Sequence, residues 1–156
     1  LIFLNFAQVV SALFNQPGPP YSFFYRRQFG DPAAGVDIGP MLAFTRLTTP
    51  SQGGTFTGTL AWQTTAGQAA DVQQVIVEQP QGFSSVPVWD IVLPGSERSA
   101  AMPASALAQV PAGAQIQWIV ITARSPRFDY DRFGYQQLGV NAWTSFTQDF
   151  SSFFTR

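Results

Sequence analysis

Residues 55–63, TFTGTLAWQ, alternate between two kinds of side chain. Phe56, Leu60 and Trp62 fall on one face, whereas the threonines fall on the other. A period of two is that of a β-strand with one buried and one solvated face. This segment therefore predicts a strand whose aromatic face belongs to a core.

Further short apolar segments that are typical of strands follow along the chain. In AQIQWIVITAR (114–124), Ile116, Trp118 and Val120 share one face while Ile119 and Ile121 lie opposite, so this strand is expected to be covered on both sides. The other expected strands are MLAFTRLTT (41–49), VQQVIVEQ (72–79), VPVWDIVL (86–93), SERSAAM (96–102) and YQQLGVNAWTSFTQDF (135–150). PASALAQV (103–110) is expected to be a short helical or irregular crossover.

Seven candidate strands with no long helix between them indicate an all-β fold, an antiparallel sandwich. We expect its domain to span residues 40–148, preceded by an extension (1–39) and followed by a tail (149–156). The last ten residues match the spacing of a helix as well as the end of a strand. The expected core comprises Phe56, Leu60, Trp62, Val75, Val77, Ile116, Trp118 and Val120.

The order of these strands resembles that of fibronectin type III and related immunoglobulin-like domains. The resemblance is carried by TLAWQ (59–63), where Trp62 stands in the place of a second-strand core tryptophan, and by VPAGAQIQWIVITAR (110–124), which is similar to the turn and sixth strand. Ile116 stands where a tyrosine usually makes a corner hydrogen bond, so that bond is not expected here.

Together with TTPSQGG (48–54) and VWDIVLPG (88–95), these motifs are similar to domains of bacterial surface lipoproteins and exported proteins. The resemblance covers about residues 40–148. It implies adhesion, spacing or assembly, and it transfers no functional residue, because the matching positions are core positions. Fold likeness is in any case a weak guide to function.

The composition bears on nucleic-acid binding and on cellular location. Charged residues make up 11% of the chain and the net charge is -1, against about 25% charged residues in ordinary soluble proteins. No basic footprint for nucleic acid is present. A surface solubilised by Ser, Thr, Gln and Gly favours an extracytoplasmic location, at the cell surface, in the periplasm or secreted.

The chain contains no His, Cys or Lys. This excludes the His general base, the Ser-His-Asp and Cys-His nucleophile systems, Schiff-base chemistry and His or Cys metal sites. Asp129 and Asp131 form the only close carboxylate pair and are weak candidates for a calcium site; Arg127 and Arg132 flank them and favour a solvated loop instead. We therefore expect no enzyme, no cofactor and no metal, with a hydrolase working through carboxylates alone as a remote alternative.

Residues 1–14, LIFLNFAQVVSALF, are strongly apolar but lack the basic region of a signal peptide. As a helix they would span about 21 Å, less than the hydrocarbon core of a bilayer. Asn5, Gln8 and Ser11 recur every three positions, which places them on one side of a helix. The preferred interpretation is a helix packed on a protein surface. A remnant of a membrane helix comes second, and an extended strand lent to a neighbour third.

Residues 16–40 are rich in proline and glycine and are expected to be an ordered linker pinned by aromatic side chains. Apolar extensions that a sandwich does not need for its own core are best explained by burial against another protein subunit, of the same or a different chain. The leading hypothesis is therefore a non-catalytic module for protein assembly, and the alternative is a carbohydrate-binding module. The expected partner-binding residues are Leu1, Phe3, Leu4, Phe6, Val10, Phe14, Tyr21, Phe23, Phe24, Tyr25, Phe29 and Trp143.

Overall fold

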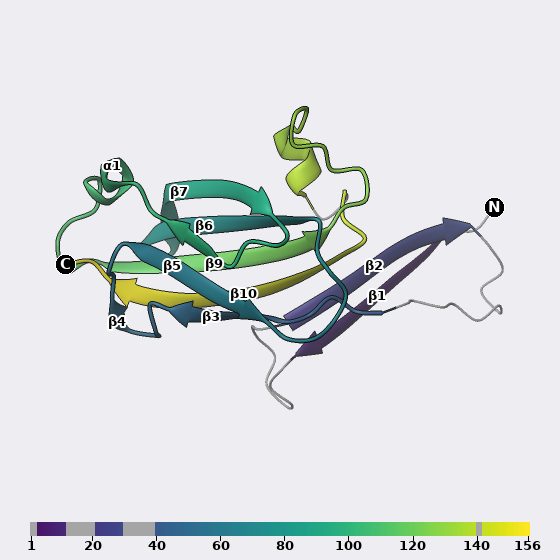
Figure 1. Ribbon diagram of the computed structural model, residues 1–156, viewed down its shortest axis with the longest axis horizontal. Coiled ribbons are helices and arrows are strands. Elements are labelled where there is room, and N and C mark those ends of the chain that lie inside the picture. The colour runs from purple at the N-terminus through teal and green to yellow at the C-terminus, as the bar shows by residue number, and fades with distance from the viewer. Residues whose placement is uncertain (1–2, 12–20, 30–39, 140–141) are drawn as a thin grey trace.

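Two β-sheets face each other in the computed structural model, which describes residues 3–11, 21–29, 40–139 and 142–156, with side chains from residue 40 onward (Figure 1). The strands are β1 (Phe3–Ser11), β2 (Tyr21–Phe29), β3 (Thr45–Thr49), β4 (Gly54–Thr55), β5 (Thr59–Thr64), β6 (Val72–Gln81), β7 (Ser84–Pro94), β8 (Ser99–Ala101), β9 (Gln115–Arg124) and β10 (Ser145–Phe154). A short helix, α1 (Ala104–Leu107), and a 3-10 turn, Tyr135–Leu138, complete the elements.

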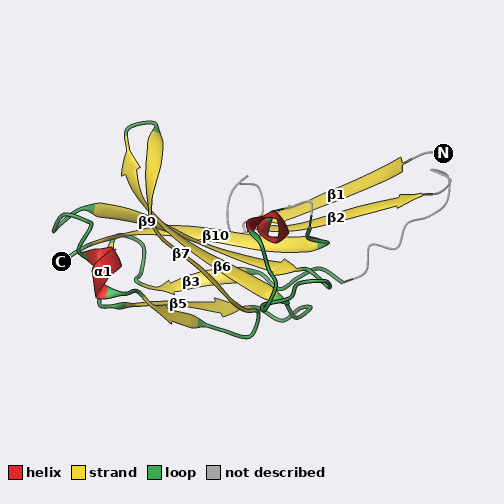
Figure 2. Cartoon of the chain, turned by 90° about the horizontal axis from the view of Figure 1, so that it is seen from above, coloured by secondary structure: helices red, strands yellow, loops and turns green. Residues whose placement is uncertain are grey.

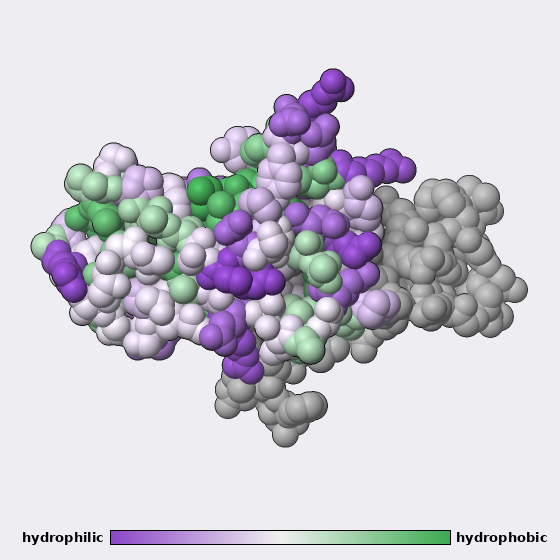
Figure 3. Space-filling model, viewed as in Figure 1, coloured by the Kyte–Doolittle hydropathy of each residue, from purple (hydrophilic) through white to green (hydrophobic). Residues whose placement is uncertain are grey.

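The large sheet has the order β1-β2-β10-β9-β6-β7, and β4 pairs with β10 in parallel. The small sheet has the order β3-β5-β8. The expected all-β sandwich is therefore confirmed at the level of two packed sheets, and β1 and β2 extend beyond the two-layered part (Figure 2). Residues of intermediate hydropathy cover much of the face seen in Figure 3, in keeping with the low charge content.

The core between the sheets contains all eight residues predicted from the sequence. Trp62, on β5, and Trp118, on β9, are 1% and 0% exposed. Phe153 joins them from β10 and stacks on Phe56, with ring centroids 5.1 Å apart. The period-two alternation of the sequence is therefore the alternation between the core and the outside.

The segment predicted as one strand over residues 55–63 is two strands in different sheets. β4 pairs with β10 in the large sheet, whereas β5 lies between β3 and β8 in the small sheet. The chain changes sheet at Phe56–Gly58, where Gly58 has a φ of 105°. Because side chains disfavour this region of φ, a glycine at the crossing is physically suitable. The alternation still holds through the crossing, since Phe56 and Leu60 are both buried.

A second buried cluster lies on the opposite face of the large sheet. Val72 and Ala123 come from β6 and β9, and Leu138 and Trp143 come from the long β9–β10 connection, which folds back over that face. This covering explains why β9 is buried on both faces near Arg124, as its sequence predicts. Ile121 is half-buried against the same cluster.

The two ends of the chain differ from the expectations. The helix preferred over residues 1–14 is wrong for Phe3–Ser11, which form β1 and pair with β2 along nine residues. A pattern within one segment does not reveal a pairing partner elsewhere, and pairing with β2 satisfies the backbone groups on one side of β1. Residues 149–156 are not a separate tail, because β10 runs to Phe154. Within the described residues, no helix has the length and apolarity needed to cross a membrane.

Candidate functional site: a groove on the large sheet

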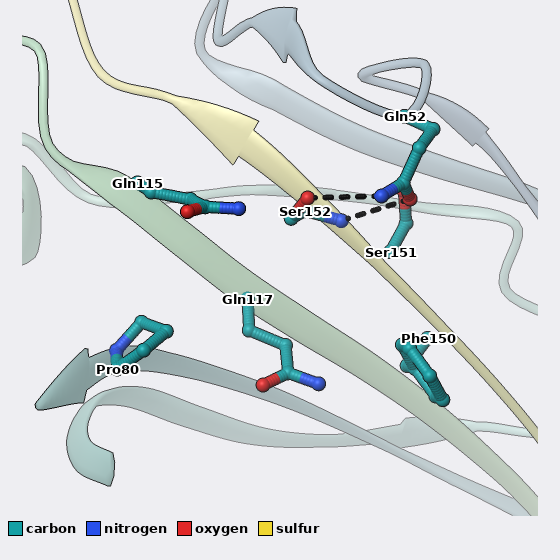
Figure 4. A pocket seen from close by; sticks show the side chains of 7 residues that line it. All are labelled: Gln52, Pro80, Gln115, Gln117, Phe150, Ser151 and Ser152. Carbon is teal, nitrogen blue, oxygen red and sulfur yellow. Dashed lines mark hydrogen bonds between the residues drawn. The ribbon is translucent and has the colours of Figure 1, made fainter. Parts of the chain in front are cut away.

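A shallow groove of about 330 Å³ lies on the outer side of the large sheet, near the ends of β6, β9 and β10. Figure 4 shows its lining, with the carboxamide of Gln117 between Pro80 and Phe150 and that of Gln115 directed towards Ser152. The complete lining is Gln52, Pro80, Gln115, Gln117, Phe150, Ser151 and Ser152.

The alternation of β9 places the two glutamines of the groove. Ile116 and Trp118 point into the core, so Gln115 and Gln117 point outwards. On β10, Ser152 is the cross-strand neighbour of Gln117. Cross-strand neighbours on one face lie within about 5.5 Å of each other between their Cβ atoms, which brings amide and hydroxyl together.

One wall of the groove comes from β6. Beyond Glu78 the strand continues to Pro80, and the turn end of the β6–β7 hairpin stands out of the sheet (Figure 2). Glu78 is the cross-strand neighbour of Gln117, and its Oε2 accepts a hydrogen bond from the Ser85 hydroxyl at 2.7 Å. That carboxylate is not among the lining residues, which carry no charge.

The other wall is the edge of β10, which Gln52 closes. Its Oε1 accepts hydrogen bonds from the Ser151 hydroxyl at 2.8 Å and from the Ser152 backbone N–H at 3.2 Å. Its Nε2 donates to the Ser152 hydroxyl at 3.0 Å (Figure 4). This side of the groove is therefore held by bonds within the chain.

The glutamines of β9 differ from Gln52. The side-chain amides of Gln115 and Gln117 have no hydrogen-bond partner among the residues that the structure describes. Beside them, the ring of Phe150 is 45% exposed. The groove thus offers two free carboxamides and one aromatic face, which can bind a ligand by hydrogen bonds and stacking.

Asp149, next to Phe150, is a buried carboxylate that ties the two sheets together. Its Oδ2 accepts a hydrogen bond from the backbone N–H of Leu47 at 3.0 Å, and its Oδ1 accepts one from Phe150 at 3.0 Å. Burial raises the pKa of Asp149, although these two bonds and the charge of Arg46 act in the opposite direction. It faces the seam between β3 and β10, so we assign it a structural role.

Of the residues predicted for a partner or a metal, three have described side chains. Trp143 is 6% exposed and packs in the second cluster, where its Nε1 donates to the carbonyl oxygen of Gln137 at 3.1 Å. Its assignment to a partner surface is therefore wrong, because its own chain covers it. Asp129 and Asp131 are exposed, and the Asp131 N–H donates to Asp129 Oδ1 at 2.9 Å. Within the described residues, no three His, Cys, Asp or Glu side chains gather as a metal site would need.

The other predicted partner residues belong to the N-terminal extension. The structure places the backbone of nine of them on β1 and β2 but does not describe their side chains, and Leu1 and Phe14 lie outside the described residues altogether. The nine are Phe3, Leu4, Phe6, Val10, Tyr21, Phe23, Phe24, Tyr25 and Phe29.

The strand edges give a second candidate surface. β7 forms one edge of the large sheet and carries Pro87, Pro94 and the exposed Asp90, residues that hinder pairing with another strand. The edges of the small sheet are short, with five residues in β3 and three in β8. β1 forms the opposite edge of the large sheet, nine residues without a proline or a charge. Among the described strands it is therefore the long edge with the least protection.

Sequence reasoning did not identify Gln115, Gln117 or Phe150 as functional. The alternation that predicts Ile116 and Trp118 in the core also predicts outward glutamines, so that signal was present. The position of Phe150 was hidden by the ambiguity of the last residues. Comparison of the chain with family models, with curated proteins and with solved structures found no match.

Proposed function

We propose that this chain is a non-catalytic module with a fibronectin type III or immunoglobulin-like fold, which assembles with other protein chains outside the cytoplasm through its N-terminal hairpin. The observation that carries the assembly proposal is the unprotected edge of β1.

The strand order supports the finer fold assignment. Three strands, β3-β5-β8, face β10-β9-β6-β7, which corresponds to A-B-E against G-F-C-C′ of immunoglobulin-like sandwiches. Trp62 is buried on the second strand of this sandwich, β5, as the resemblance implies. Ten consecutive pairs join β9 and β10, which would be the last two strands of such a domain.

The edge of β1 supports assembly by strand pairing. An unpaired edge presents a row of free N–H and C=O groups to any other strand, and natural domains usually block long edges. β2 is bound on one side to β1 and on the other to Ser145–Gln148 of β10, so a strand added to β1 would continue the large sheet. Peptide recognition by strand addition works in this way.

The low charge content and the absence of residues for common catalysis support a binding module over an enzyme. The low charge content also supports a location outside the cytoplasm. A β-sandwich of this kind, with an aromatic-rich N-terminal extension, fits a subunit or spacer of an extracytoplasmic assembly.

The first experiment compares the intact chain with a variant that lacks Leu1–Phe29. We expect the truncated chain to keep its β-rich circular dichroism spectrum and cooperative unfolding, because the core lies between β3–β10. We expect the intact chain to sediment as an oligomer and the truncated chain as a monomer. An intact chain that stays monomeric, or a truncated chain that unfolds, would contradict the proposal.

Two single substitutions test the edge itself. In an antiparallel strand, consecutive backbone N–H groups point to opposite sides. Of Gln8→Pro and Val9→Pro, one therefore removes an N–H on the free edge and the other removes an N–H that bonds to β2. We expect the free-edge variant to lose assembly while its unfolding midpoint stays close to that of the intact chain. If both variants assemble normally, pairing through β1 is refuted.

A further inference from the structure

We infer that the groove on the large sheet binds a neutral carbohydrate chain, across the outer faces of β9 and β10. This inference is independent of the proposed assembly, because the groove lies on β6, β9 and β10 and uses no residue of the N-terminal hairpin.

Two exposed aromatic rings lie along β10. Phe150 and Phe154 are 45% and 41% exposed and stand on the same side of the strand, separated by Ser152 on that side. Four residues of an antiparallel strand span about 13–14 Å. Two rings at this separation form a strip longer than one sugar ring, and an apolar ring face can stack on a sugar.

The adjacent strand provides hydrogen-bonding groups beside these rings. Gln115 is the cross-strand neighbour of Phe154, Gln117 that of Ser152, and Ile119 that of Phe150. A carboxamide donates and accepts at once, as a sugar hydroxyl does. The two free amides and the Ser152 hydroxyl therefore match a ligand that carries many hydroxyl groups.

The absence of charge in the lining of the groove indicates which polyhydroxylated ligands fit it. None of the seven lining residues is charged. A phosphate or a carboxylate-bearing ligand would require Arg or Lys for affinity. The groove therefore fits a neutral saccharide and does not favour an anionic one.

The covering of the rest of this face by the chain itself argues against a simple protein interface. At the other end of the outer face, the chain covers the apolar residues Val72 and Ala123 with its own Leu138 and Trp143. What it leaves open is the end where aromatic rings alternate with amides and a hydroxyl. The buried centre of a protein interface is usually more apolar than this.

The test uses the full chain in native gels that contain a soluble neutral polysaccharide. The panel is hydroxyethylcellulose, xyloglucan, galactomannan, amylopectin and a soluble β-1,3-glucan, with alginate as the anionic comparison. We expect at least one neutral polymer to retard the chain and alginate not to do so. Retardation by no neutral polymer, or by alginate alone, overturns the inference.

Four variants locate the binding. Phe150→Ala should weaken retardation about tenfold, as expected for loss of a stacking ring. Gln117→Ala should weaken it about fivefold, as expected for loss of one neutral hydrogen bond. Phe150→Trp, with a larger ring, should retain or strengthen it. The matched control is Phe83→Ala, which removes a fully exposed ring at the hairpin turn, outside the lining.

Because Phe150 and Phe83 are both exposed, neither alanine variant should disturb folding, and equal thermal midpoints check this. Equal losses of retardation in both variants, or no loss in Phe150→Ala, would show that the polymer does not bind in the groove. Phe150→Ala leaves the N-terminal hairpin unchanged, so this variant should sediment like the intact chain. This result would separate the carbohydrate site from the assembly surface.

Discussion

Trp62 and Trp118 allow a comparison that isolates one buried hydrogen bond. Both are almost fully buried in the same cluster. Trp62 Nε1 donates to Gln73 Oε1 at 2.7 Å, and Gln73 itself is 0% exposed. Trp118 Nε1 is buried and has no hydrogen-bond partner among the described residues. The two indoles therefore differ mainly in whether their N–H group is satisfied.

Substitution of each tryptophan by phenylalanine removes a similar volume, so the packing losses largely cancel between the two variants. Trp62→Phe also leaves the Gln73 carbonyl oxygen buried without a donor, which costs about 1–3 kcal/mol. Trp118→Phe removes an N–H that is already unsatisfied. We therefore expect Trp62→Phe to lower the free energy of unfolding by about 1–3 kcal/mol more than Trp118→Phe does.

Urea unfolding followed by far-ultraviolet circular dichroism measures both variants without relying on tryptophan fluorescence. For comparison, Trp118→Ala should lower the free energy of unfolding by about 3–5 kcal/mol, because it empties a large aromatic site. A loss for Trp118→Phe equal to or larger than that for Trp62→Phe would refute the argument. An unchanged midpoint for Trp118→Ala would show that this tryptophan is not part of the core.

Two further predictions concern polar groups between the sheets. The Thr45 hydroxyl lies 2.8 Å from that of Thr122 and 3.0 Å from that of Thr147, and all three are buried. Thr45→Val should therefore lower the free energy of unfolding in urea by about 1–3 kcal/mol. Thr57→Val, at an exposed position, should leave it almost unchanged. Because the pKa of Asp149 is raised above 3.8 in the folded chain, the folded state holds its proton to higher pH, and the free energy of unfolding should fall as pH rises from 3.8 through the raised value. Asp149→Asn should remove this part of the pH dependence, and an identical pH profile in the variant would disprove it.

The sequence predicts the sandwich well where one strand face meets the core. The alternation around Trp62 and Trp118 depends only on neighbouring residues, so it can be read without knowing which strands pair. The outcome at β1 shows the limit of this reasoning. The spacing of Asn5, Gln8 and Ser11 fits one side of a helix, but the structure pairs these residues with β2, which no pattern within β1 encodes.

The groove and the sheet crossing depend on contacts between distant segments. The outward direction of Gln117 follows from its strand, but its proximity to Pro80 and Phe150 requires the order β6-β9-β10. Similarly, a glycine at residue 58 indicates a local irregularity, but the change of sheet there depends on β4 pairing with β10. The sequence places Trp143 on a partner surface because it does not reveal that the β9–β10 connection folds back and buries this side chain.

β10 is the strand through which the parts of the large sheet are joined. Its first residues pair with β2, its whole length pairs with β9, and its last residues pair with β4. The β1–β2 hairpin extends at one end of the long axis and β10 finishes at the other (Figure 1). Tension between these two ends runs parallel to β10, while its ladder hydrogen bonds lie across the strand. Such a force loads many of these bonds together in shear instead of opening them one after another, so the strand order gives this domain mechanical resistance along its long axis.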